Sequence, residues 1–133
     1  MKEFGESLGI AFQILDDILD VTGDEGTFGK TPGVDIRERK PSLVNVLWIK
    51  TGTALSRQLL LPPQSPDENL FIAEAIQAIK NSCVLEHASS MAHDYAGKSR
   101  IALLSALAKN PCQNEPATQE LLLLIDNVTK RLS

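Results

Sequence analysis

The feature that most constrains the fold is the apolar periodicity near the start of the chain. From Leu8 to Val21 the sequence reads LGIAFQILDDILDV, which contains no proline and repeats apolar residues at helical spacing. The pattern predicts a helix from about Lys2 to Thr22, and Gly23 can end it in a left-handed cap. Because no strand-like alternation of useful length occurs along the chain, the sequence predicts an all-α fold.

The rest of the chain divides at its glycines and prolines. Residues 23–41 are rich in both and are predicted to form a loop. Ser42 begins a predicted helix that continues toward Leu60, with Gly52 as its weak point, and the prolines of residues 61–66 end it. Asp67 is predicted to cap a helix near 68–80, followed by a kink at 81–82. Further helices are predicted over 84–109 and from 116 or 117 to about 132, which makes five or six in total.

Composition narrows the class of protein. The chain has 133 residues, enough for one small domain, and its net charge of -4 argues against a general nucleic-acid partner. Its 2 cysteines exclude a disulfide scaffold. No apolar run approaches the ~20 residues that a membrane-spanning helix needs, and the N-terminus lacks the order of a signal peptide. These features predict a cytoplasmic protein with no transmembrane segment.

A polar stripe interrupts the first predicted helix. Gln13, Asp16, Asp17 and Asp20 lie three or four residues apart and therefore share one face. No basic residue follows them before Lys30, and the other faces of the helix are almost entirely apolar. Burying several unpaired carboxylates is costly, so the stripe is predicted to line a wet cavity and to hold a divalent metal. Hard oxygen ligands of this kind suit Mg²⁺, which also bridges to phosphates.

A plainer interpretation is that the DDxxD pattern merely caps or decorates a helix surface. Acidic pairs are common on protein surfaces, and the bare pattern would favour this interpretation. Here Phe12-Gln13 precede the pattern and Gly29-Lys30 follow it, and this context favours the metal interpretation.

The stretch GIAFQILDDILDVTGDEGTFGKTPGVDIRERKPSL resembles the second aspartate-rich region of the trans-isoprenyl diphosphate synthases. A weaker similarity to the late helix of the family begins at Tyr95-Ala96-x-Lys98. The resemblance implies a helical bundle of the isoprenoid-synthase type around a deep central cavity. It also implies that residues 1–133 are the C-terminal portion of a synthase, with a motif helix (1–22), a diphosphate and metal loop (23–41) and a helical remainder (42–133). The matching elements are Phe12-Gln13, Asp16-Asp17-x-x-Asp20, Gly23-Asp24, Gly29-Lys30, Asp35 and Lys40.

The same resemblance implies a reaction and a set of site residues. The reaction is a Mg²⁺-dependent condensation of an allylic diphosphate with isopentenyl diphosphate. Preplaced metal and lysines would stabilise the negative charge of the departing diphosphate. Asp16 and Asp17 would bind Mg²⁺, with Asp20 in support directly or through water. The residues implied to contact the allylic diphosphate or its surroundings are Gln13, Lys30 and Lys40.

The chain departs from the family pattern in ways that affect the expected activity. It carries one DDxxD motif where the family has two, and it lacks the arginine pair and lysine that hold isopentenyl diphosphate. We therefore expect a C-terminal fragment that is inactive by itself. Arg39 and Val44 stand where the family usually has Gly and Pro.

Two other functions remain open. The first is a non-catalytic helical subunit or truncated relative that binds diphosphate or a partner chain. The second, a terpene cyclase, is less favoured because cyclases usually pair one DDxxD with an Asn/Ser/Glu motif.

The apolar faces of the first helix also predict an association. Without upstream helices, residues such as Leu8, Phe12, Leu15 and Leu19 would be exposed, and large apolar patches rarely stay bare in a soluble monomer. We expect a homo-oligomer or pairing with the missing half of a synthase.

Overall fold

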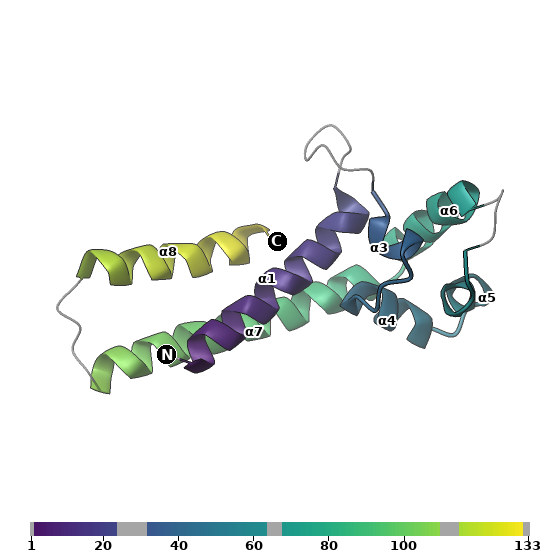
Figure 1. Cartoon of the computed structure of the whole chain (residues 1–133). Helices are drawn as coiled ribbons and strands as arrows, with labels where there is room; N and C mark the ends of the chain where they lie inside the picture. Colours follow the sequence, from purple (N-terminus) through teal and green to yellow (C-terminus); the bar gives the residue numbers. More distant parts are fainter. Residues whose placement is uncertain (1, 24–31, 64–67, 110–114, 132–133) are drawn as a thin grey trace. The chain divides into compact units, whose positions relative to one another are not determined.

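The computed structural model describes residues 2–23, 32–63, 68–109 and 115–131 of the chain. Helices account for all of the regular structure in these ranges, and no strand occurs among them, which confirms the all-α prediction. They comprise seven α-helices and one 3₁₀-helix, more than the five or six expected. In chain order (Figure 1) these are α1 (Lys2–Thr22), α3 (Val34–Arg37), α4 (Leu43–Lys50), α5 (Ala54–Arg57), η1 (Gln58–Leu60), α6 (Glu68–Lys80), α7 (Val84–Lys109) and α8 (Glu115–Arg131).

Backbone contacts divide the chain into two compact units. The first, called the long-helix unit here, contains residues 1–15 and 89–133. The second, called the short-helix unit, contains residues 16–88. Helices α1 and α7 each contribute to both units, and the end of α1 that carries the acidic stripe belongs to the short-helix unit.

The long-helix unit is built around a buried stripe of α7. The spacing of three and four residues places the members of this stripe on one face of the helix. Their side chains are small except for the leucine that ends the series. The stripe consists of Ala92, Ala96, Ser99 and Leu103, all at most 2% exposed.

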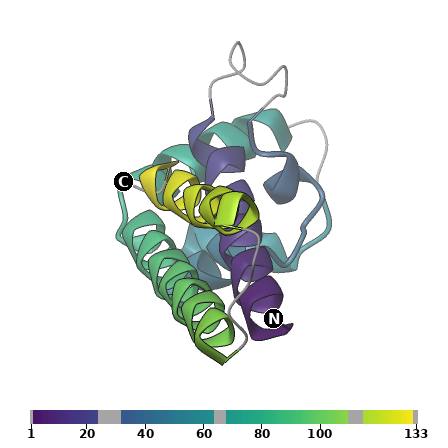
Figure 2. The ribbon, with the colours of Figure 1, turned by 90° about the vertical axis from the view of Figure 1, so that its left-hand side faces the viewer.

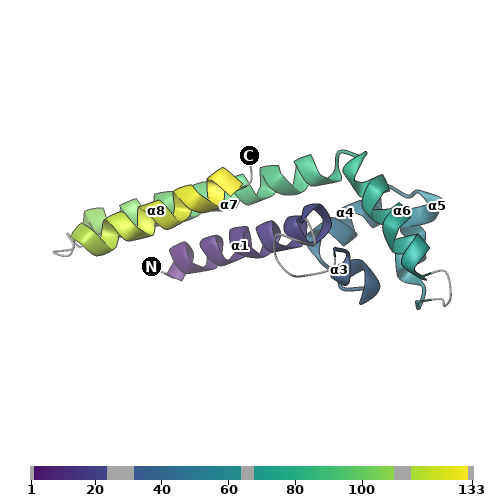
Figure 3. The same cartoon turned by 90° about the horizontal axis from the view of Figure 1, so that it is seen from above.

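Helix α8 runs antiparallel to α7, as Figures 1 and 3 show, and Figure 2 views the two helices from the side on which α7 ends and α8 begins. Ile125 and Val128 are the buried side chains of α8, at 2% and 1% exposure. On the exposed side, the Arg100 guanidinium of α7 donates to the Asp126 carboxylate of α8 over 2.9 Å. The helix predicted from 116 or 117 to about 132 is confirmed with its start at Glu115.

The short-helix unit corrects the prediction of one helix over 42–60. Helix α4 begins where expected, since Ser42 accepts a hydrogen bond from the Asn45 amide. It ends at Lys50 because Gly52 takes a left-handed φ of 73°, a conformation that terminates a helix. Thr53 then caps α5 by accepting from the Ser56 amide over 3.2 Å.

Two further expectations need correction. The predicted loop 23–41 contains the short helix α3, although its residues 24–31 lie outside the described part of the chain. Leu8 and Leu15 are buried, at 7% and 2% exposure, so the expected exposure of the apolar faces holds for Phe12 but not for them. The helices expected over 68–80 and 84–109 are confirmed, while the proposed cap Asp67 lies outside the described residues.

Helix α6 packs closely against the start of α3. The N-cap residue of α3, Gly33, has a φ of 88°. A Cβ atom at this position would lie 2.6 Å from Ile72 Cγ2 and 3.1 Å from Ile76 Cδ1 of α6. Glycine is therefore required both by the backbone conformation and by the close approach of the two helices. None of the described helices has the length and apolar character needed to cross a membrane.

Candidate functional site

The three aspartates of the acidic stripe lie on the last turns of α1 and differ in their surroundings. Asp16 is exposed, Asp20 is half-buried and Asp17 is only 4% exposed. The prediction that they belong to one helix is confirmed by α1. The three carboxylates therefore lie in different environments.

Asp17 and Asp20 tie the end of α1 to the beginnings of the next two helices. The Leu43 amide, first in α4, donates to Asp17 Oδ2 over 3.0 Å. The Asp35 amide, in the first turn of α3, donates to Asp20 Oδ2 over 3.0 Å, and the Gly33 amide donates to the Asp20 carbonyl over 2.9 Å. A carboxylate at a helix N-terminus satisfies an amide that has no partner within the helix and interacts favourably with the helix dipole.

A fourth acid, Asp35, joins this cluster. Burial raises the pKa of the Asp35 carboxyl, and the negative charge of Asp20 raises it further, with smaller contributions from Asp17 and Asp16. Lys40 acts in the opposite direction: its Nζ lies 3.8 Å from Asp35 Oδ1. The negative charges of Asp16, Asp17 and Asp20 therefore all act against ionisation of the Asp35 carboxyl, and a bound cation would relieve this effect.

The sequence did not indicate a role for Asp35, although this residue is one of the matching elements of the resemblance. The sequence feature that could have pointed to Asp35 is the change of charge in this loop. Asp35 is followed there by the basic residues Arg37, Arg39 and Lys40. Position alone could not show that the amide of Asp35 reaches back fifteen residues to Asp20.

Lys40 is held by its backbone while its side chain stays accessible. Its amide donates to the Asp35 carbonyl over 2.9 Å, and its own carbonyl accepts from Asn45 Nδ2 over 2.8 Å. The Lys40 side chain is 47% exposed. Asn45 also donates to the Asp35 carbonyl over 3.2 Å, and its buried Oδ1 has no hydrogen-bond partner among the described residues.

The structure thus brings together four of the expected residues, namely Asp16, Asp17, Asp20 and Lys40, and adds Asp35. Gln13 is exposed on the part of α1 that belongs to the long-helix unit. Lys30 lies outside the described residues. Within the described ranges, no three His, Cys, Asp or Glu side chains form a group that could hold a metal ion by themselves. The metal and diphosphate roles remain predictions.

A separate pocket of about 250 Å³ lies elsewhere in the short-helix unit. Residues of α4 and of the beginning of α7 line it, and it contains none of the acids described above. The lining residues are Leu47, Lys50, Thr51, Cys83, Val84 and His87.

Comparison with known proteins places this helical chain and its acidic stripe in a family. Residues 1–94 match the family described as polyprenyl synthetase. Over 133 residues the chain is 30% identical to a short chain isoprenyl diphosphate synthase of Methanothermobacter thermautotrophicus, covering 98% of this chain and 38% of that protein. It is 33% identical over 132 residues to a geranylfarnesyl diphosphate synthase of Aeropyrum pernix, covering 99% of this chain and 40% of that protein. An octaprenyl diphosphate synthase of Escherichia coli is 31% identical over 112 residues, 84% of this chain and 34% of that protein.

The chain belongs to the polyprenyl synthetase family. It spans about 40% of the length of the relatives that it matches most fully. No solved structure matched the chain.

Proposed function

We propose that this chain is the part of a trans-polyprenyl diphosphate synthase that binds Mg²⁺ and the diphosphate group of an allylic substrate. The observation that carries the proposal is the cluster of four carboxylates, Asp16, Asp17, Asp20 and Asp35, with Lys40 beside it. Family membership supports the same assignment, since the similar proteins are named as isoprenyl diphosphate synthases of several product classes.

The donor set fits a hard divalent cation. Its atoms are carboxylate oxygens, and, after burial, the negative charge of Asp20 is the next largest cause of the raised pKa of Asp35. Asp16, the exposed member, is the carboxylate best placed to reach a metal that keeps part of its water shell. Asp17 and Asp20 each engage Oδ2 with a backbone amide, so we assign them to both metal binding and support of the adjoining helices.

The reaction we propose is the condensation of the allylic diphosphate with isopentenyl diphosphate. Bound Mg²⁺ would supply neutralising charge for the departing diphosphate. Lys40 contributes a further positive charge, and its exposed ammonium can contact a phosphate oxygen. Lys30 and Gln13 are proposed to contact the same substrate group.

We further propose that the 133-residue chain does not carry out prenyl transfer by itself. Its sequence contains one aspartate-rich motif of the DDxxD type, whereas the resemblance implies two, together with a basic site for isopentenyl diphosphate. We also propose a cytoplasmic location, and association with a second copy or with a complementary chain; the exposed apolar Phe12 of α1 supports the association.

Calorimetric titration with geranyl diphosphate in the presence of Mg²⁺ tests the binding part of this proposal. We expect binding that requires the metal, and a loss of about tenfold or more in affinity in Asp16→Ala and in Lys40→Gln. Asp94→Ala is the matched control, because Asp94 is also a helical aspartate but lies on α7 in the long-helix unit. Metal-independent binding, or equal affinities in Asp16→Ala and Asp94→Ala, would refute the assignment.

A radiolabelled assay tests the inactivity of the isolated chain. We expect no incorporation of isopentenyl diphosphate into a longer product by the purified chain with geranyl diphosphate and Mg²⁺. Incorporation that disappears in Asp16→Ala would overturn the proposed inactivity while supporting the assignment of the site.

A further inference from the structure

Arg39, the residue before the proposed substrate lysine, has an unusual backbone conformation. Its φ is 54°, in the left-handed region that residues other than glycine rarely occupy. In the resembled family this position usually holds glycine, for which the conformation carries no steric cost. An arginine here keeps a strained backbone, so its side chain is expected to make contacts that offset the strain.

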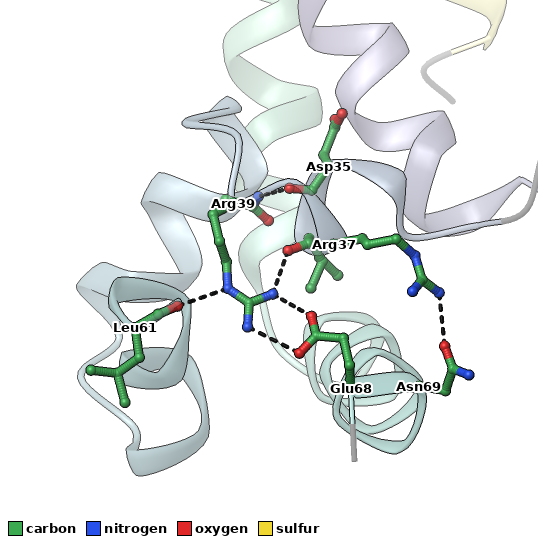
Figure 4. A network of polar contacts seen from close by, with 8 residues as sticks. Asp35, Arg37, Arg39, Leu61, Glu68 and Asn69 are labelled. Atoms are coloured by element: carbon green, nitrogen blue, oxygen red, sulfur yellow. Dashed lines mark hydrogen bonds and ion pairs between the residues drawn. The ribbon is translucent and has the colours of Figure 1, made fainter. Parts of the chain in front are cut away.

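The Arg39 side chain makes several such contacts within the short-helix unit (Figure 4). Its Nη1 and Nη2 donate to Glu68 Oε1 and Oε2 of α6 over 2.6 and 3.2 Å, in the two-bond geometry characteristic of arginine and carboxylate. Its Nε donates to the Leu61 carbonyl over 3.0 Å, and Nη1 also donates to the Ile36 carbonyl over 2.8 Å. The guanidinium carbon lies 5.0 Å from the centre of the Phe71 ring.

These contacts connect three separate parts of the short-helix unit. Ile36 belongs to α3, Leu61 follows η1, and Glu68 and Phe71 belong to α6. The packing of α6 against Gly33 is a second attachment of the same helix to the same segment. Residues 33–39 are therefore fixed to α6 at both ends, by close packing at Gly33 and by hydrogen bonds at Arg39.

The residues that flank this attachment are those of the proposed site. Lys40 follows Arg39 directly, and its amide donates to the Asp35 carbonyl. The Arg39 and Glu68 side chains are both 15% exposed, whereas the Lys40 side chain is 47% exposed. Of these two consecutive basic residues, Arg39 is largely buried and bonds to the protein, whereas Lys40 is more exposed and can reach a ligand.

We propose that Arg39 and Glu68 are positioning residues that clamp the α3–α4 connection onto α6 and thereby hold Lys40 beside the acidic cluster for diphosphate binding. The diphosphate-binding part of this inference rests on the proposed function. The clamp itself rests only on the contacts of Arg39. A largely buried ion pair often adds little to net stability, because desolvating both charges offsets their attraction. The two parallel hydrogen bonds of the ion pair nevertheless require one geometry, so the pair can favour one arrangement of the segments that it joins. Lys40 is part of one of these segments, and its position is fixed with it.

Three variants of the full 133-residue chain and one matched control separate positioning from general stability. Glu68→Gln keeps the shape of the side chain and removes its charge, whereas Arg39→Gly removes the side chain and the backbone strain together. Arg39→Lys keeps the charge but cannot form two parallel hydrogen bonds. The control is Arg37→Gln, because Arg37 also connects α3 to α6, through a single exposed bond of 2.9 Å to Asn69.

Amide hydrogen exchange tests whether Arg39 and Glu68 hold this segment in place, and the experiment needs no ligand. We expect exchange of the Lys40 amide to become about tenfold faster in Glu68→Gln and Arg39→Gly, while the buried amides of α7 keep their rates. Arg37→Gln is expected to leave the Lys40 amide unchanged. An unchanged Lys40 amide in both clamp variants would overturn the clamp.

Titration with inorganic diphosphate and Mg²⁺ measures the affinity for diphosphate and so tests the positioning role. We expect affinity to fall about tenfold in Glu68→Gln and Arg39→Gly, to recover in part in Arg39→Lys, and to stay at the parent value in Arg37→Gln. Faster Lys40 exchange with unchanged diphosphate affinity would overturn the positioning role. Failure of the parent chain itself to bind Mg²⁺ and diphosphate would overturn the proposed function, whereas the exchange experiment would still decide whether the clamp exists.

Discussion

The two units of this chain differ in how much polar side chains add to the apolar packing inside each unit. In the long-helix unit, α7 buries a stripe of small and apolar side chains, and the ion pair between Arg100 and Asp126 lies exposed at the surface. The short-helix unit also has an apolar core, which includes Trp48 and Ile79. In addition, polar side chains bind its backbone: Asp17 and Asp20 accept hydrogen bonds from amides of α4 and α3, and Asn45 donates to two carbonyls.

The difference follows from helix length. A helix of 26 residues, such as α7, satisfies most of its backbone groups internally, so an apolar stripe is sufficient to pack it. A helix of 4 residues, such as α3, leaves most of its amides and carbonyls without helical partners, and these groups need partners from side chains. A segment rich in such partners is also suited to present charged groups at fixed positions.

The largest expected effect tests the apolar side of this comparison. Leu103 is fully buried, so Leu103→Ala should lower the free energy of unfolding by about 2–5 kcal/mol through lost apolar burial and the cavity left behind. Urea denaturation measures the change. The neighbouring Leu104 is 48% exposed, and Leu104→Ala should cost less than about 0.5 kcal/mol. Similar losses in the two variants would contradict the assignment of the buried stripe.

The next largest effect tests the polar contacts of the short-helix unit. Asn45 is 2% exposed, and its Nδ2 donates to the carbonyls of Asp35 and Lys40. Asn45→Asp replaces this donor with an oxygen that faces both carbonyls, which should cost about 1–3 kcal/mol at neutral pH. The exposed Asn81→Asp serves as the control. A loss in Asn45→Asp no larger than that of the control, measured by urea denaturation, would show that these two hydrogen bonds do not hold the segment.

The same difference between the units explains how much the sequence could predict. The long helices α1 and α7 were predicted with their observed bounds, because apolar periods over many turns are a strong signal. The prediction of one helix over 42–60 failed because the conformation of Gly52 outweighed an apolar pattern that runs across it. Short helix α3 has too few residues to show a period, and its stability depends on contacts with Asp20 and α6 that are distant in sequence.

For the site, sequence spacing placed the three aspartates on one helix, but it could not distinguish their environments. Asp16 and Asp17 are adjacent in sequence, yet one is exposed and the other buried against the start of α4. The clamp between Arg39 and Glu68 spans 29 residues, and no local pattern relates the two positions. Tertiary contacts of this kind become visible only when the elements are placed in space.

Glycine substitutions provide a third comparison of the units. Gly33→Ala places a Cβ 2.6 Å from Ile72 Cγ2 at a φ of 88°, so we expect a loss of about 1–3 kcal/mol in the free energy of unfolding. Gly97 lies inside α7, where an added Cβ would meet no neighbouring atom of the described residues within 4 Å, so Gly97→Ala should stabilise by about 0.5–1 kcal/mol. Thermal unfolding of the two variants checks the opposite signs. A stabilising Gly33→Ala would mean that α6 does not approach α3 as closely as described.

The smallest expected effect concerns pH and the acidic cluster. Burial, followed by the charge of Asp20, raises the pKa of the Asp35 carboxyl above its ordinary value of 3.8. The folded chain therefore keeps a proton on Asp35 at pH values where the unfolded chain has lost it. Between these two pKa values the folded state binds more protons, so the contribution of Asp35 to the free energy of unfolding decreases as pH rises through this window.

Asp35→Asn removes this titration and should therefore lose less stability than the parent chain as the pH rises above 3.8, the ordinary pKa of the Asp35 carboxyl. Lys40→Gln should act in the opposite direction, because Lys40 lowers the pKa of Asp35 and its removal widens the window. Urea denaturation at a series of pH values, without Mg²⁺, measures both differences. Equal pH dependence in the parent and in Asp35→Asn would mean that neither burial nor the neighbouring acids raise the pKa of Asp35. The proposed metal site would then lose its electrostatic basis, while the apolar packing of the long-helix unit would be unaffected.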